Sequence, residues 1–199
     1  MKKFFLSFVV AICSIVCVSA QELTNSMFNI YYGQPKTLVQ SSSMMPGTIT
    51  IEFDRSGRVL SKTVGDGKMV YNWSTDGTSV EVKAYNNGQY MGSGMIYIET
   101  MTSKMYKYTA DGASIEVTFR PNGSINKMIM SGGGQSMSTT YYYNSSTDAY
   151  PYKIISAGGG QSMTLSVTRI EKDFKGNCVR FTQSAQGQSV VCTNTISYY

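Results

Sequence analysis

The sequence predicts an all-β protein, an antiparallel meander of about a dozen strands in stacked hairpin repeats that form a single curled sheet or an open barrel. Three observations predict this fold. Turn dipeptides recur at short intervals from residue 48 onward. The segments between them alternate apolar and polar residues with a period of two, which is typical of strands with one covered face and one solvated face. No segment after residue 20 has a helical period of useful length.

Residues 1–20 have the pattern of a secretory signal peptide. Two lysines precede an apolar stretch, and the small residues of Val18-Ser19-Ala20 form a cleavage site. We therefore expect secretion across the inner membrane, to the periplasm or the exterior, and a mature chain of residues 21–199 that forms a single β-hairpin-repeat domain. A lipoprotein is the weaker alternative, because bulky Ile12 and Val16 precede the cysteines of this stretch, where lipid attachment requires small residues.

Composition narrows the range of partners. No later stretch approaches the roughly 18 consecutive apolar residues of a transmembrane helix. The formal net charge of +5 is small and its basic residues are dispersed, so nucleic acid is not an expected partner. No cofactor is expected either.

Three segments show the strand pattern most clearly, at residues 49–53, 80–84 and 115–119. In each of them every second residue is apolar, and the residues between are Thr, Glu or Lys. This alternation places the apolar side chains on one face of a strand and the polar side chains on the other.

Ten turn signals separate such segments. Asp-Gly and Asn-Gly are favoured in type I′ hairpin turns, because both central residues of that turn need a positive φ. The signals are Ser56-Gly57, Asp66-Gly67, Asp76-Gly77, Asn87-Gly88, Asp111-Gly112, Asn122-Gly123, Gly132 to Gly134, Gly158 to Gly160, Lys175-Gly176 and Gln186-Gly187. Short connections join antiparallel neighbours, so consecutive strands are expected to pair.

The hexapeptide GGGQSM occurs at residues 132–137 and again at 158–163. We interpret the glycines as a turn and Gln-Ser-Met as the start of the outgoing strand, so that one hairpin separates the two copies. TDGTSVEV (75–82) and ADGASIEV (110–117) form a second pair of similar segments. A lone hairpin is marginally stable in water, so such units are expected to pack side by side. A phosphate-binding role for the glycines would need a following helix, and a β-rich run follows instead.

Four fragments share an aromatic residue that leads into a turn: FDRSGR (53–58), YNWSTDG (71–77), YKYTADG (106–112) and DFKGN (173–177). They resemble tyrosine-aspartate (YD) repeats, as in rearrangement-hotspot proteins. Over about residues 30–199 the chain is similar to small secreted bacterial proteins with degenerate copies of these repeats. The resemblance implies a β-hairpin meander and no particular activity. Several copies lack the aspartate after the aromatic residue, and the chain is too short for the large toxin-enclosing shell, so that function is not implied.

Catalytic chemistry has few candidate residues. Histidine is absent, which removes the common Ser-His-Asp and Cys-His relays and imidazole metal sites. Asp66, Asp76 and Asp111 precede turn glycines, where a short acceptor side chain favours the turn. No three acids cluster as in a calcium loop. We therefore expect a protein that is not an enzyme and has no metal site. A carbohydrate-active enzyme that uses paired carboxylates is an alternative.

Two cysteines follow the signal segment. Cys178 and Cys192 flank the turn at Gln186-Gly187, so their strands are expected to pair and to bring the two thiols near one another. In an oxidising compartment this predicts a disulfide. The alternative is a pair of free, buried thiols.

Aromatic residues supply the candidate binding site. The sequence contains 15 tyrosines, and five aromatic residues of the repeats are candidates for ligand binding: Trp73, Tyr106, Tyr108, Tyr141 and Tyr143. Exposed aromatic rings stack against sugars or hold a peptide, so a surface glycan or an envelope protein is the expected kind of partner. The alternative is that these rings pack across strands inside the sheet.

These observations favour a secreted, non-enzymatic β-repeat protein that binds or scaffolds a partner at the cell envelope. A small outer-membrane β-barrel is an alternative. It needs strands of about 9–11 residues with an unbroken apolar phase toward lipid. Several predicted strands are shorter, and the alternate positions of the last strand are mostly polar: Val191, Thr193, Thr195 and Ser197.

Overall fold

Fourteen antiparallel strands make up most of the described chain. The computed structural model describes residues 33–43, 45–102, 105–110 and 112–199. The predicted signal peptide, residues 1–20, lies outside the described residues. The strands are β1 (Pro35–Ser42), β2 (Met45–Phe53), β3 (Val59–Val64), β4 (Gly67–Trp73), β5 (Ser79–Asn86), β6 (Gln89–Met101), β7 (Met105–Ala110), β8 (Ala113–Phe119), β9 (Ile125–Gly132), β10 (Gln135–Tyr142), β11 (Lys153–Gly158), β12 (Gln161–Lys172), β13 (Cys178–Ala185) and β14 (Gln188–Tyr198).

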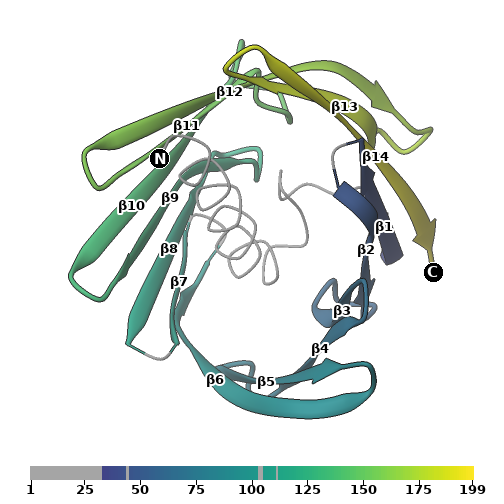
Figure 1. The fold of residues 1–199 in the computed structure, drawn as a ribbon, viewed down its shortest axis with the longest axis vertical. Helices are drawn as coiled ribbons and strands as arrows, with labels where there is room; N and C mark the ends of the chain where they lie inside the picture. The colour runs from purple at the N-terminus through teal and green to yellow at the C-terminus, as the bar shows by residue number, and fades with distance from the viewer. Residues whose placement is uncertain (1–32, 44, 103–104, 111) are drawn as a thin grey trace.

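The strands close into a barrel in sequence order. Each strand pairs with the next one along the chain, and β1 also pairs with β14, so that the first and last strands complete the ring (Figure 1). At the closure, Leu38 lies opposite Ile196 on one side and opposite Ile51 on the other. The predicted all-β meander is confirmed, and its sheet is closed.

The two ends of the barrel have different connections. At one end, which we call the tight-turn end, the strand bounds leave two residues per connection, as at Asn87-Gly88 between β5 and β6. Asn87 has φ 50° and Gly88 has φ 77°, the pair of positive angles that a type I′ turn requires. At the other end, the long-turn end, connections are longer: residues 54–58, 74–78, 120–124, 143–152 and 173–177.

The repeated GGGQSM motif forms the same structure twice. Its second and third glycines have nearly equal positive angles in both copies, φ 58° and 77° at Gly133 and Gly134, and φ 58° and 76° at Gly159 and Gly160. The first glycine has another role: a Cβ on Gly158 would lie 3.0 Å from the Ser136 carbonyl oxygen. Strands β10 and β12 then begin at the glutamine of each copy. The interpretation of the motif as a turn followed by an outgoing strand is therefore confirmed.

No helix long and apolar enough to cross a membrane occurs in the described ranges.

Candidate functional site

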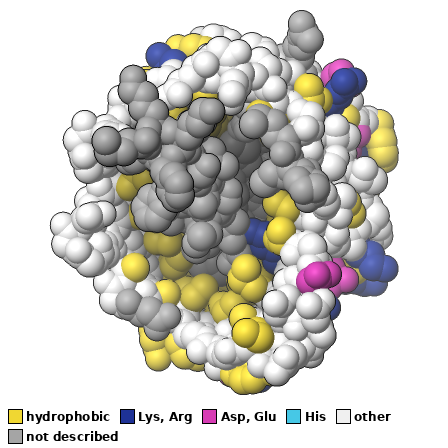
Figure 2. Space-filling view, in the orientation of Figure 1, with side chains coloured by type: hydrophobic (Ala, Val, Ile, Leu, Met, Phe, Trp, Pro, Cys, Tyr) yellow, Lys and Arg dark blue, Asp and Glu magenta, His cyan; other side chains and the backbone are white. Residues whose placement is uncertain are grey.

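The pairing register shows which side chains share one face of the barrel wall. Residues directly opposite each other in antiparallel strands point to the same face. One such row runs around the wall through Leu38, Ile51, Lys62, Met69 and Ala84. Hydrophobic side chains are visible along the lower inner rim of the ring (Figure 2), and residues of the buried hydrophobic cluster occupy the same face of neighbouring strands. The inner wall of the barrel is therefore mainly apolar, with a few buried polar side chains.

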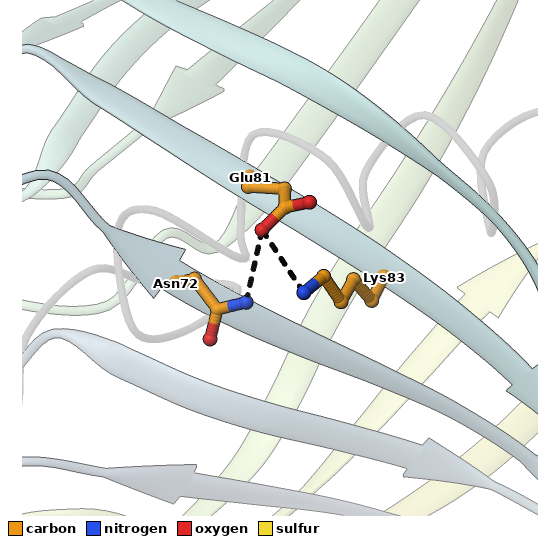
Figure 3. A network of polar contacts seen from close by, with 3 residues as sticks. All are labelled: Asn72, Glu81 and Lys83. Carbon is orange, nitrogen blue, oxygen red and sulfur yellow. Dashed lines mark hydrogen bonds and ion pairs between the residues drawn. The ribbon is translucent and has the colours of Figure 1, made fainter.

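The outer wall is mixed: polar side chains alternate there with hydrophobic ones such as Ile129, Ile155 and Tyr97. Asn72 and Glu81 face each other on β4 and β5, where Asn72 Nδ2 donates to Glu81 Oε2 at 3.2 Å and Lys83 Nζ lies 3.3 Å from the same oxygen (Figure 3). These contacts lower the pKa of Glu81, and the hydrogen bond from Asn72 contributes most. On β2, β10 and β12 the same outward phase is occupied by hydroxyl side chains: Thr48, Thr50, Ser136, Ser138, Thr140, Ser162, Thr164, Ser166 and Thr168.

Side-chain size along the inner wall changes from one end of the barrel to the other. Toward the long-turn end the inward residues are bulky, and several are fully buried, among them Phe53, Val59 and Val80. Toward the tight-turn end several inward positions are small: Ala84, Ala110, Gly132, Gly158 and Ala185. The buried inward side chains are therefore bulkier at the long-turn end than at the tight-turn end.

Lys62 is a cation on this apolar wall. It lies opposite Ile51 on one side and Met69 on the other, and its exposed fraction is 3%. Among the described residues it is the one buried side chain that carries a charge. Sequence reasoning missed it, because regular alternation from Val59 places Lys62 outside. A register shift between the pairs Phe53–Val59 and Glu52–Ser61 inserts one residue and turns Lys62 inward.

The carboxylates of the long turns hold the backbone. Asp54 Oδ1 accepts the backbone N–H groups of Ser56 and Arg58 at 2.8 and 2.9 Å. Burial raises the pKa of Asp54, but these hydrogen bonds outweigh it and keep the pKa below its ordinary value. Asp173 Oδ1 accepts from Lys175 and Asn177 in the same way. In the part of the chain that the structure describes, no three His, Cys, Asp or Glu side chains gather as metal ligands do.

The five aromatic candidates lie on the inner side and do not form an exposed stripe. Tyr108 and Tyr141 have exposed fractions of 1% and 5%. The half-buried Trp73 donates its indole N–H to the Val59 carbonyl at 2.9 Å. Tyr106 packs edge-on against Phe119, with ring centroids 4.8 Å apart, and the Tyr143 hydroxyl donates to the Ile125 carbonyl at 2.5 Å. The expectation of an outward binding face is therefore corrected. The alternation correctly places these aromatic side chains on one face of the sheet, but that face is the inner one.

The predicted disulfide between Cys178 and Cys192 is also corrected. Both cysteines are free and buried. The register explains why: Cys192 lies opposite Phe181, and Cys178 lies three residues before Phe181, at the start of β13. The backbone carbonyl of Cys178 is held instead by Asn194 Nδ2 at 3.0 Å. Burial raises the pKa of Cys178 to about 12 and also raises the pKa of Cys192.

No family model and no curated protein matches the chain. Among solved structures, it is similar to a porin-like protein from Bacteroides vulgatus. The two sequences are 10% identical, the TM-score is 0.45, and the match covers 83% of this chain and 98% of that one.

Proposed function

We propose that this protein is a water-soluble barrel of the cell envelope that binds an elongated apolar molecule, such as an acyl chain, in its lumen. The observation that carries the proposal is the inner wall, whose side chains are mainly hydrophobic. The hydroxyl, carboxylate and ammonium groups among the outward side chains are suited to water. An inner wall of hydrophobic residues gains free energy when an apolar ligand replaces water, about 0.8 kcal/mol per buried CH₂ group.

The number of strands is consistent with a barrel wide enough to hold a ligand. A barrel of about eight strands is filled by its own side chains, and barrels of about 16–18 strands leave a channel. Fourteen strands fall between these cases. Inward hydrophobic residues such as Val82, Leu165 and Val190 are only partly buried although they belong to the apolar wall. Their remaining exposed surface is what a ligand would cover.

Methionines make part of this wall adaptable. Met130 on β9 lies opposite Met137 on β10. Met163 on β12 also points inward, because it lies opposite Ser156, an inward residue of β11. Unbranched thioether side chains repack around ligands of different shape. A wall of this kind suits a flexible chain better than a rigid ring system.

A barrel that spans the outer membrane is a second candidate. A closed ring with an even number of antiparallel strands favours it. Such a barrel needs an outward apolar band. Outward Ile129, Ile155 and Tyr97 favour such a band, whereas Glu81 and Lys83 on the same outer wall oppose it. Cell fractionation separates the two proposals: a water-soluble carrier is released without detergent, and a spanning barrel stays with the membrane until detergent is added.

Binding of the neutral fluorophore N-phenyl-1-naphthylamine tests the carrier proposal. We expect a saturable rise in fluorescence, because the dye emits strongly only in an apolar site. Ala110→Trp places a ring on the inner wall near the tight-turn end and should weaken dye binding. Its matched control, Thr109→Trp, changes the neighbouring outward residue of β7 and should leave binding intact. No saturable binding, or equal loss in both variants, would contradict the proposal.

A further inference from the structure

Cations and aromatic rings meet at the long-turn end, where the last strand closes the barrel against the first. Tyr199 directly follows β14, and the cationic groups of Lys36 and Arg55 lie 5.9 and 5.5 Å from the centre of its ring. Beside it, Lys175 Nζ lies 3.7 Å from the ring centre of Tyr198, the last residue of β14. Cations at such distances are attracted by the face of an aromatic ring. The contacts therefore keep rings and cations together on one surface.

Phe174 extends this surface toward solvent. Its exposed fraction of 87% is the largest of any large hydrophobic residue that the structure describes. Its ring contacts the Tyr198 ring edge-on, with centroids 6.2 Å apart, and Lys175 Nζ lies 5.8 Å from its centre. We define the closure patch as five residues of this surface: Lys36, Arg55, Phe174, Lys175 and Tyr199. Four of them are exposed, and Lys175 is half-buried.

The carboxylates of the two connections in the patch are bound within their own turns. Asp54 Oδ1 accepts from two backbone N–H groups and from the Ser56 hydroxyl. Asp173 Oδ1 accepts from two backbone N–H groups, and its Oδ2 accepts from the Tyr198 hydroxyl. The exposed side chains that remain at this corner of the barrel are cationic or aromatic.

We propose that the closure patch docks the barrel on a membrane surface that carries anionic lipid headgroups. Such a surface attracts Lys and Arg side chains at short range. Tyr199 suits the same region, because a tyrosine ring is apolar and its hydroxyl is polar. Phe174 has no polar group on its side chain and can enter the boundary between headgroups and acyl chains. The patch therefore matches an anionic bilayer in both charge and apolarity.

The size of the patch favours a bilayer over a protein partner. A stable protein interface uses about 20–30 residues on each side, far more than the closure patch contains. A membrane surface requires no matching shape, so that a few rings and charges are sufficient. Attachment by so few groups is reversible, and this suits a carrier that leaves the membrane again.

The inference rests on the proposed function in one respect, because it requires a water-soluble barrel. It does not depend on a ligand in the lumen. Binding of N-phenyl-1-naphthylamine, measured on the same variants, therefore distinguishes the two proposals. Variants of the closure patch should keep the dye binding of the wild-type protein.

Sedimentation with lipid vesicles tests the proposal. The protein is mixed with vesicles of phosphatidylcholine alone, or of equal parts of phosphatidylcholine and phosphatidylglycerol, and the bound fraction is measured. We expect binding to the anionic vesicles. The bound fraction should fall as sodium chloride rises from about 0.1 M to about 1 M, because salt screens exposed charges.

Charge variants locate the binding surface. Removing the three cations of the patch should weaken binding roughly a hundredfold, about fivefold for each cation; this variant combines Lys36→Gln, Arg55→Gln and Lys175→Gln. The matched control makes the same change in net charge on outward lysines of β4, β5 and β9 and should bind nearly as wild type; it combines Lys68→Gln, Lys83→Gln and Lys127→Gln.

Phe174 separates docking from a purely structural role. If the patch only holds the end of β14 in place, Phe174→Ser should change neither vesicle binding nor stability, because its ring is almost fully exposed. If the patch docks on a membrane, Phe174→Ser should weaken vesicle binding roughly tenfold and leave the melting temperature unchanged. Its control is Tyr90→Ser, an exposed aromatic residue near the tight-turn end, which should bind vesicles as wild type.

Three results would overturn the inference. The first is that the wild-type protein binds neutral and anionic vesicles equally or binds neither, which needs no variant to fold. The second is an equal loss of binding in the two triple variants. The third is an equal loss in Phe174→Ser and Tyr90→Ser. Any of these results with intact dye binding would reject the closure patch alone, whereas protein that stays with membranes until detergent is added would reject the proposed function as well.

Discussion

Cys178 and Cys192 lie in the barrel wall with their thiols shielded from water. A thiolate is the reactive form of cysteine, and burial in apolar surroundings disfavours it. Because the pKa of Cys178 is raised to about 12, the neutral thiol dominates throughout the physiological range.

We predict that both thiols of the folded protein are free and unreactive. Iodoacetamide should label neither at neutral pH in native buffer, and it should label both at once after denaturation. Intact-mass spectrometry before and after labelling measures this. A fall in mass that corresponds to a disulfide, or rapid labelling of native protein, would contradict the placement of Cys178 and Cys192 in the structure.

The connections between strands divide the barrel into two chemically different ends. Two-residue turns rich in glycine form one end, whereas at the other end a glycine in the fourth position of four connections donates its N–H to the carbonyl of the first residue. These bonds run from Gly57 to Asp54, Gly77 to Ser74, Gly123 to Arg120 and Gly176 to Asp173, at 2.9–3.0 Å. The fragments that resemble YD repeats at residues 53–58, 71–77 and 173–177 belong to this long-turn end.

The two copies of GGGQSM should respond equally to substitution. A Cβ added to Gly134 or Gly160 meets nothing within 4 Å, and both residues have positive φ. Alanine at either position should therefore cost only backbone strain, about 1–2 kcal/mol of unfolding free energy. Urea denaturation of Gly134→Ala and Gly160→Ala measures this, with Ser162→Ala on the outer wall as the control. A large difference between the two glycine variants would contradict the identity of the two turns.

Turn chemistry made the elements predictable, and their placement needed the structure. Asn87-Gly88 and the triple glycines identify hairpins, because few residues tolerate positive φ. TDGTSVEV and ADGASIEV look alike, yet the first enters β5 from the long-turn end and the second enters β8 from the tight-turn end. Three strands separate them, an odd number, which places them at opposite ends. Local sequence similarity carries no information about which end a turn occupies.

The direction of the apolar phase and the closure of the sheet also escaped sequence reasoning. Alternation places Tyr141 and Tyr143 on one face, but it does not tell whether that face is concave or convex. The pairing of β1 with β14 joins residues such as Val39 and Thr195, and no local signal marks a contact between the two ends of a chain. The inward position of Lys62 depends on a single extra residue in β3, and such bulges have weak sequence signals.

As a whole, the molecule has a mainly hydrophobic inner wall and an outer wall on which charged, hydroxyl and hydrophobic side chains are mixed. Its hydrophobic residues surround a lumen, and its charged pairs lie outside. A closed sheet also removes the free edges through which β-proteins associate. The hydrophobic inner wall supports the proposed binding of an apolar molecule inside the barrel.

Trp73 provides the most direct test of this account. It is the one tryptophan of the chain, and it lies on the inner wall. It is four residues from Met69, so it lies about 13 Å farther from the tight-turn end than the row that contains Met69 and Lys62. Dodecanol that carries bromine at its chain end should quench the fluorescence of Trp73 in a saturable way, since bromine quenches indole at contact. Unbrominated dodecanol should bind without quenching and should compete the quenching away. Fluorescence that stays unchanged while dodecanol is bound, or quenching that never saturates, would contradict an apolar ligand site inside the barrel.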